Sequence, residues 1–416
     1  MARSVEMHKM LRRMFITILL LALLSGCAGD PPLPTTPAPV TQTSAPEATA
    51  TAEPAPTETP LPPTATEPPA PPTATFTPAP VAYGPSGFPV DVNPLSGLAV
   101  GDPALLERRP LAVKVQLFPR GQRPPFGVSL ADVVYDYYQN FGLTRLHAIF
   151  LGQDAQTVGP VRSARLLDIQ LVDMYKTIFV FGSAEQRTYS KLFGQEFANR
   201  LVVEGNANCP PMCRTDPNGY NFLVTNTAEL NSYAAAQGAS TGRQNLDGMH
   251  FNPLTPSGGL PGQQASVRFS ISAYTRWDYD PASGRYLRSQ DVQEAPDIQS
   301  EAYAPAIDGM TNQQIGADNV VLLFAPHRMA FGTKPGISEV VQIELEGSGP
   351  ALAFRDGQVY QVEWHRPTAD SVLFLTFPQG VLYPYKPGKT WYEVVGKSTK
   401  ITDLGNGLWH FQNLLP

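Results

Sequence analysis

Residues 159–165 form the segment best suited to bind an anion. The segment has the sequence GPVRSAR and places Arg162, Ser163 and Arg165 within four consecutive positions. A helix beginning near Val161 would set free backbone N–H groups and the positive end of its dipole beside these side chains. Because a guanidinium offers paired planar donors to phosphate, carboxylate or sulfate, we predict an anion or glycan site here. Arg145, at the start of the preceding strand, is expected to join it.

The same arginines also have a structural interpretation. Asp132, Asp136, Asp154 and Asp168 lie close in sequence and would form ion pairs that hold a strand against a helix. Residue type and spacing are compatible with both interpretations, and both stay open at this point.

Few other residues are spaced for chemistry. The six histidines lack the H-E-x-x-H spacing of a metal site, and His147 alternates with apolar residues as a buried strand histidine would. No G-x-S-x-G, Walker, G-x-G-x-x-G or S-x-x-K motif occurs in a supporting context. We therefore expect no metal and no cofactor, and we favour a binding protein over an enzyme.

The elements that position these residues begin near residue 84. Strands are predicted at 111–117, 132–138, 145–151 and 177–181, and helices at 163–172 and 227–237, the latter with Thr227 as N-cap. The Gly/Pro-rich stretch 253–263 is the predicted boundary between domains 84–255 and 264–416.

The second domain has the pattern of an all-β structure. Strands are predicted at 267–274, 320–324, 340–345, 352–355, 359–364, 371–377 and 391–395, with a hairpin over 277–286 and a helix only around 311–315. Its aromatic residues would pack in a core, with sugar stacking as the alternative. These residues are Trp277, Tyr279, Tyr286, Trp364, Tyr383, Tyr385, Trp391 and Tyr392. The fold class predicted for the whole chain is α+β, with a mixed N-terminal domain and a strand-rich C-terminal one.

Residues 1–27 have the pattern of a bacterial lipoprotein signal. A positive stretch precedes the apolar run 14–24, which is shorter than the roughly 20 residues of a spanning helix. The run ends in Leu24-Ser25-Gly26-Cys27, which resembles the lipobox of bacterial lipoproteins. That resemblance implies removal of residues 1–26 and lipid attachment to the Cys27 thiol, so the protein would be anchored on the extracytoplasmic side of the cell membrane.

Residues 27–83 are predicted to be a disordered tether. Between residues 30 and 80 there are 17 prolines, five acids and no Lys or Arg. Such a segment has too little apolar surface to offset the entropy of ordering. The chain as a whole carries a net charge of −6, which excludes a strongly basic nucleic-acid binder.

Cys209 and Cys213 are the only cysteines besides Cys27. In an extracytoplasmic protein, this C-x₃-C spacing in a Pro-rich loop favours a small disulfide. Free or metal-bound thiols are the alternative, although no histidine lies nearby in sequence.

Several motifs resemble the YerB-like lipoproteins, a bacterial family of unknown function with two consecutive regions. The matching stretches include NPLSGL (93–98), LTRLHAIF (143–150), VGPVRSAR (158–165), FRDGQVYQVEW (354–364) and PYKPGKTWYEVV (384–395). The resemblance covers nearly all of 93–396. It implies mixed α+β layers followed by a strand-rich region, and it implies no activity.

Two departures from the family pattern bear on the site. Where the family has a histidine and an asparagine after an Arg-Asp pair, this chain places Arg214 and Asn221 but no histidine. The family's His-Gly-Gly-Ser stretch corresponds here to Phe181-Gly182-Ser183. Ser183, Arg214 and Asn221 therefore join the predicted anion site, and a mechanism that depends on those histidines is not expected.

Three functional hypotheses follow from these observations. The first is a lipid-anchored protein that binds an anionic or glycan polymer of the cell envelope through the arginines. The second is an envelope hydrolase or transferase acting on a glycan phosphodiester, with the arginines as charge clamps. The third is a protein–protein scaffold that uses the β-rich domain.

Overall fold

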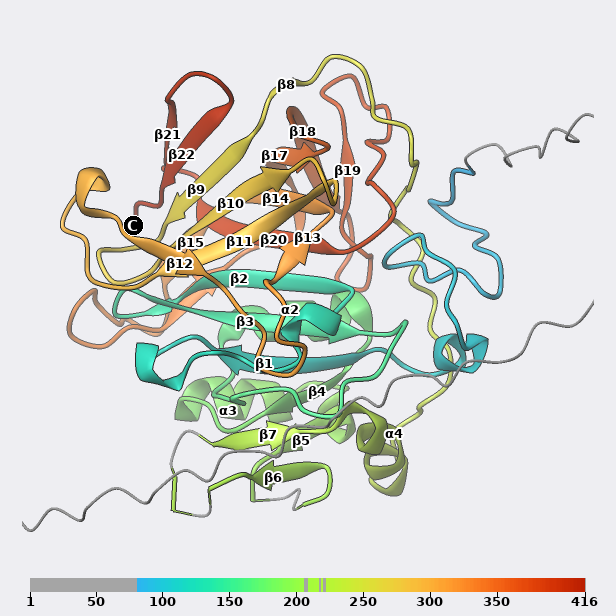
Figure 1. The fold of residues 1–416 in the computed structure, drawn as a ribbon. Helices are drawn as coiled ribbons and strands as arrows, with labels where there is room; N and C mark the ends of the chain where they lie inside the picture. The colour runs from blue at the N-terminus through green and yellow to red at the C-terminus, as the bar shows by residue number, and fades with distance from the viewer. Residues whose placement is uncertain (1–80, 206–208, 217, 220–221, 416) are drawn as a thin grey trace, which may run out of the picture. The chain divides into compact units, whose positions relative to one another are not determined.

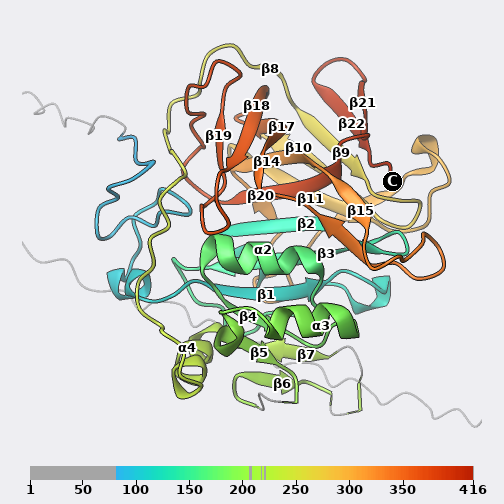
Figure 2. The same cartoon turned by 180° about the vertical axis from the view of Figure 1, so that it is seen from behind.

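Two β-sheets and a layer of helices make up the computed structural model, which describes residues 81–205, 209–216, 218–219 and 222–415. All of these belong to one compact unit. The signal segment, Cys27, most of the tether and Asn221 lie outside the described residues. Figures 1 and 2 show the larger sheet in the middle, with the helices on one side and the smaller sheet on the other. The α+β fold class is confirmed.

The larger sheet is 11-stranded and runs in the order β19-β18-β17-β14-β20-β2-β3-β1-β4-β5, with β8 paired to β18. Its strands are β1 (Leu111–Gln116), β2 (Val133–Asn140), β3 (Leu143–Phe150), β4 (Ile178–Phe181), β5 (Leu201–Val203), β8 (Leu260–Pro261), β14 (Asn319–Ala325), β17 (Gly347–Arg355), β18 (Gln358–Arg366), β19 (Phe374–Thr376) and β20 (Thr390–Gly396). Residues 347–349, which lie between the predicted strands 340–345 and 352–355, extend β17 and pair with Trp364–Arg366 of β18.

The smaller sheet is 7-stranded and runs in the order β12-β11-β10-β9-β22-β21, with β13 paired to β11. Its strands are β9 (Gln264–Arg268), β10 (Tyr274–Asp280), β11 (Arg285–Asp291), β12 (Tyr303–Pro305), β13 (Gly316–Ala317), β21 (Lys400–Asp403) and β22 (Leu408–Gln412). Two short antiparallel pairs complete the described strands: β6 (Met212–Arg214) with β7 (Leu223–Thr225), and β15 (His327–Met329) with β16 (Val341–Ile343).

Helices α2 (Leu166–Tyr175), α3 (Gln186–Phe193) and α4 (Thr227–Ala236) pack beside strands β1 to β5. Thr227 is the first residue of α4 rather than its N-cap. Asn226 takes the cap position, and its side chain accepts a hydrogen bond from the backbone N–H of Ala228 at 3.0 Å. The Thr227 hydroxyl instead donates to Asp154 at 2.7 Å. No helix forms at 311–315, where the chain turns around the buried Asp308.

The larger sheet takes strands from both sides of the stretch 253–263. β2 of the first predicted domain pairs in parallel with β20 of the second. The two regions therefore share one core, and the β2–β20 pairing places side chains of both regions in the same buried layer. Seven of the eight aromatics predicted for the core are in it, each at most 2% exposed: Trp277, Tyr286, Trp364, Tyr383, Tyr385, Trp391 and Tyr392. Tyr279 is partly buried and packs against the core.

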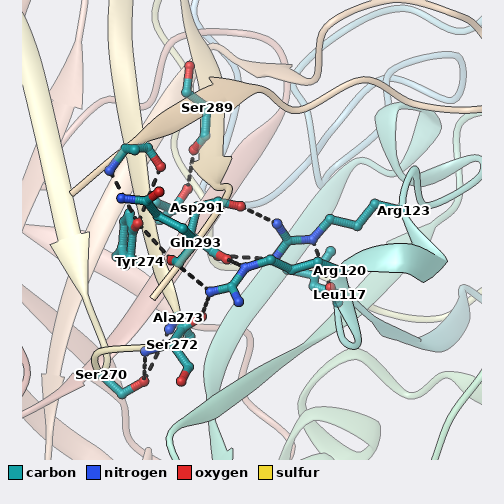
Figure 3. Close-up of polar contacts among 12 residues, drawn as sticks. Leu117, Arg120, Arg123, Ser270, Ser272, Ala273, Tyr274, Ser289, Asp291 and Gln293 are labelled. Carbon is teal, nitrogen blue, oxygen red and sulfur yellow. Dashed lines mark hydrogen bonds and ion pairs between the residues drawn. The ribbon is translucent and has the colours of Figure 1, made fainter. Parts of the chain in front are cut away.

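Two ion pairs join the loop after β1 to the smaller sheet, as Figure 3 shows. Arg120 Nε and Arg123 Nη2 donate to the two oxygens of Asp291 at 2.6 and 3.0 Å. Arg120 also donates to the carbonyl oxygens of Ser272 and Gln293, each at 2.8 Å. The Asp291 side chain is 4% exposed, so these ion pairs are largely buried. They hold the loop after β1, which borders the arginine cluster described next.

Candidate functional site

Five predicted site residues meet at one end of the strands β3, β1 and β4 of the larger sheet. Arg145 lies near the start of β3. The segment before α2 carries Arg162, Ser163 and Arg165, and Ser183 follows β4. Arg145 Nη1 donates to the carbonyl oxygen of Ser163 at 2.8 Å, and the hydroxyls of Ser163 and Ser183 are 2.8 Å apart. We call Arg145, Arg162 and Arg165 the arginine cluster.

The segment before α2 is extended, so the prediction of a helix beginning near Val161 is wrong. The helix begins at Leu166, and the backbone N–H of Val161 donates to Leu223 instead. The backbone N–H of Arg165, at the N-cap, donates to Asp168 Oδ2 at 2.6 Å. Because these N–H groups are occupied, the donors available to an anion come from side chains.

Neutral acceptors surround the guanidinium groups. Arg165 donates to Gln139 Oε1 at 2.6 Å, and Arg162 Nε donates to Gln116 Oε1 at 2.5 Å. Burial holds the pKa of Arg145 well below its ordinary value, and the charges of Arg165 and Arg162 lower it further. The guanidinium groups of the arginine cluster are therefore partly buried and lie together at this end of the strands.

Three of the four aspartates considered as alternative partners pair with other cations, and Asp132 accepts hydrogen bonds from neutral donors. Asp154 pairs with Arg108 at 2.8 Å, and Asp136 pairs with Arg288 at 3.0 Å. Asp132 accepts hydrogen bonds from Asn93 and from the backbone of Leu151 and Gly152. Asp168 pairs with Lys114, as described below.

Two cavities flank the arginine cluster. One of about 230 Å³ is lined by Gln116, Gln139 and Arg145, among others. The other, of about 350 Å³, is lined by Ser163 and Arg165, among others. Gln116 Nε2 and Arg145 Nε are buried and have no hydrogen-bond partner among the described residues. Two residues of the first cavity's lining therefore carry a buried donor without a partner.

A buried polar cluster lies beneath the arginines, between the sheet and α2. Lys114, His147 and Asp168 are fully buried. Asp168 Oδ1 accepts from Lys114 Nζ at 3.2 Å, from His147 Nδ1 at 2.8 Å and from the Tyr137 hydroxyl. His147 is thus the buried strand histidine that its alternation predicted.

Charge in this cluster is set by burial and by its neighbours. Burial alone would raise the pKa of Asp168, but the charge of Lys114 and the bonds from His147 and Tyr137 outweigh it, so the pKa lies well below its ordinary value. Burial, with the charges of Arg145 and Arg165, lowers the pKa of Lys114 to about 7. Asp168 therefore compensates Lys114, and the carboxylates of Glu185 and Glu339 line the cavity beside Arg165.

This arrangement can bind and orient an anion. The only side-chain partner that the structure gives either serine hydroxyl is the other serine, so among the described residues neither is bonded to a general base. His147 bonds to Asp168 below the sheet edge. The geometry thus supports anion recognition and supplies no activated nucleophile.

The remaining predicted residues lie apart from the cluster or outside the description. Arg214, on β6, donates to Glu204 and to the carbonyl oxygen of Gly219. Cys209 and Cys213 are joined by a disulfide. The site residues that sequence reasoning missed are Lys114, Gln116 and Gln139; the signal for the first two was their alternation within an otherwise apolar strand.

Within the described ranges, no group of three or more His, Cys, Asp or Glu side chains could hold a metal ion. None of the helices placed there is long and apolar enough to cross a membrane.

Known proteins resemble this chain in sequence and in fold. Residues 95–240 match the N-terminal domain of the family described as "Protein of unknown function (DUF3048)", and residues 265–392 match its C-terminal domain. "Putative lipoprotein YerB" of Bacillus subtilis (strain 168) is 27% identical over 318 residues, which cover 73% of this chain and 85% of that protein. A crystal structure of the B. subtilis YerB protein superposes with a TM-score of 0.58 at 24% identity, covering 73% of this chain and 96% of that one. Together the two matched domains span most of the folded part, so the chain belongs to the DUF3048 family, in which sequence analysis had placed it as YerB-like.

Proposed function

We propose that this protein is anchored by a lipid at Cys27 on the extracytoplasmic side of the membrane, and that it binds an anionic group of a cell-envelope polymer at the arginine cluster. The observation that carries the binding proposal is the pair of unsatisfied buried donors, Gln116 Nε2 and Arg145 Nε, at the wall of a cavity. A buried donor without a partner costs about 1–3 kcal/mol, and an anion oxygen would remove that cost.

The local charge supports an anionic ligand over a neutral one. Burial, with the charges of Arg165 and Arg162, holds the pKa of Arg145 well below its ordinary value, and burial lowers the pKa of Arg165. Asp168 is the carboxylate bonded to Lys114 beneath them. A phosphate or carboxylate would offset this repulsion and accept bidentate hydrogen bonds. Two cavities border the cluster, one lined by Arg145 and the other by Arg165, and this arrangement fits a polymer with repeated anionic groups.

Replacing Arg162 with glutamine is expected to weaken phosphate binding at least tenfold. A hydrogen bond to a charged group contributes about 1.5–3 kcal/mol, and 1.4 kcal/mol is a factor of ten in affinity. The measurement is calorimetric titration of the full chain with inorganic phosphate and with poly(glycerol phosphate). Gln116→Leu, which removes the unsatisfied amide, should also weaken binding.

Arg328→Gln is the matched control, because the Arg328 side chain is 65% exposed and pairs with Glu344 away from the cluster. It should bind both probes as the wild type does. Unchanged affinity in both Arg162→Gln and Gln116→Leu, or no binding by the wild type, would contradict the anion site.

The anchor proposal has its own test. The lipobox-like sequence ending at Cys27 supports it, and so does the description of the B. subtilis relative as a "putative lipoprotein". Cells given radiolabelled palmitate should label the wild-type protein and leave Cys27→Ser unlabelled, because serine has no thiol to form the thioether. Cys209→Ser is the control and should keep the label. Equal labelling of all three proteins would show that the lipid is not on Cys27.

A further inference from the structure

A third cavity, of about 540 Å³, lies on the other face of the larger sheet. Leu352, in the wall of this cavity, is in register with Leu322 of β14, which is in register with Glu393 of β20. Glu393 is in turn in register with Asp136 of β2. Arg145 is in register with Tyr137, the next residue along β2. Because consecutive strand residues point to opposite faces, this cavity and the arginine cluster lie on opposite faces. Leu352 on β17 and Arg145 on β3 are four strands apart, roughly 19 Å at the usual strand spacing.

Both sheets contribute to this cavity. One wall comes from β17 and β18 of the larger sheet, and another from the β21–β22 hairpin, drawn in red in Figure 1. Trp409 of β22 contributes its indole, whose Nε1 donates to the carbonyl oxygen of Pro261 at 2.9 Å. That bond fixes the plane of the ring. Phe377, after β19, supplies a second partly buried ring.

The chemistry of the wall is neutral and amphipathic. None of the residues lining this cavity is charged. Gln361 and Gln379 are exposed, and their side-chain amides have no hydrogen-bond partner among the described residues. The volume falls within the roughly 300–1,000 Å³ of small-ligand sites.

These features together select one class of ligand. The C–H face of a sugar ring packs on an aromatic face, and its hydroxyls bond to side-chain amides, which donate and accept. An acyl chain would use the rings and leave both amides unpaired. An anion would find no cation in the wall.

We propose that this cavity binds a neutral saccharide unit, with Trp409 as the stacking platform and Gln361 and Gln379 as hydroxyl partners. The site is separate from the arginine cluster and does not depend on it.

The test is calorimetric titration of the full chain with two neutral probes, cellotetraose and tetra-N-acetylchitotetraose. Saturable binding of at least one is expected. Trp409→Ala and Gln361→Ala should each weaken it at least tenfold. Gln361 is exposed, so its variant should fold even if Trp409→Ala does not. Phe331→Ala, which removes a 37% exposed ring lying over Arg187 and Lys191, should bind normally.

Two results would overturn the saccharide site. One is that neither tetrasaccharide binds while 1-decanol does, which would make the cavity an acyl-chain site. The other is that binding persists unchanged in Gln361→Ala and in any folded Trp409→Ala. Arg162→Gln should leave saccharide binding intact, so failure of this site and failure of the anion site are distinguishable.

Discussion

Replacing Asp168 with asparagine is expected to lower the free energy of unfolding by about 3–5 kcal/mol, the usual result of removing one partner of a buried ion pair. Asp168 Oδ1 accepts from Lys114, His147 and Tyr137, and Oδ2 accepts from the backbone of Arg165. Every neighbour is therefore a donor. Whichever way the amide is rotated, its NH₂ group faces a donor and one acceptor is lost.

The charge change adds to the lost hydrogen bonds. Lys114 is fully buried, and Asp168 is its partner in the only salt bridge described for it. Without the carboxylate, Lys114 would have to lose its proton or remain as an uncompensated buried cation. Chemical unfolding of the wild type and of Asp168→Asn, compared at pH 7, measures the difference.

Asp173→Asn on the same helix is the matched control. Asp173 is half-buried on α2, and no hydrogen bond to its carboxylate is described. This variant should lie within about 1 kcal/mol of the wild type. A loss below 1 kcal/mol in Asp168→Asn would contradict the view that this carboxylate compensates the buried cations.

The second prediction concerns how the free energy of unfolding changes with pH. The free energy of unfolding of the wild type should fall between pH 5 and pH 8 relative to that of Glu393→Gln, by on the order of 3–5 kcal/mol. Burial, together with the neighbouring charge of Asp136, raises the pKa of Glu393 from 4.5 to about 8. The folded protein therefore keeps this proton across a range in which the unfolded chain has released it.

The sign follows from proton counting. Where the folded state binds more protons than the unfolded state, stability falls as pH rises. The contribution is complete below about pH 4.5 and is lost as the pH rises through about 8. Glutamine stays neutral throughout, so its variant lacks this dependence. Other groups titrate in both proteins, and the difference between the two reports the coupled Asp136–Glu393 pair.

The geometry explains why one proton is held here. Asp136 and Glu393 are in register on adjacent parallel strands and are both essentially unexposed. Asp136 Oδ2 accepts from Arg288 at 3.0 Å, and Glu393 Oε1 accepts from Trp277 at 2.8 Å. Their other oxygens have no partner among the described residues, so a shared proton would satisfy both.

Unfolding titrations at pH 5, 6, 7 and 8 measure this effect. Glu363→Gln is the control, because the Glu363 side chain is 52% exposed on the same sheet. It should follow the wild-type profile. Parallel profiles for the wild type and Glu393→Gln would contradict a proton held at Glu393.

Local patterns predicted most of the strands that build the site. Alternation located β1, β2 and β3 to within two residues, because each has one face toward the smaller sheet and one toward α2. Helix α3 and the hairpin β21–β22 were missed. α3 is short and polar, and β21 is largely exposed, so neither has the apolar periodicity that marks a packed element.

The sequence by itself determined the family, the lipobox-like start and the GPVRSAR motif, since these depend on which residues follow one another. Only the tertiary structure decided that Gln116 and Gln139 join the arginines, that Asp168 compensates Lys114, and that Asp136 lies beside Glu393 some 250 positions away. The reason is physical. Strand alternation states which residues share a face, but the pairing of distant strands and the layer packed on that face decide which charges meet and which donors remain unpaired.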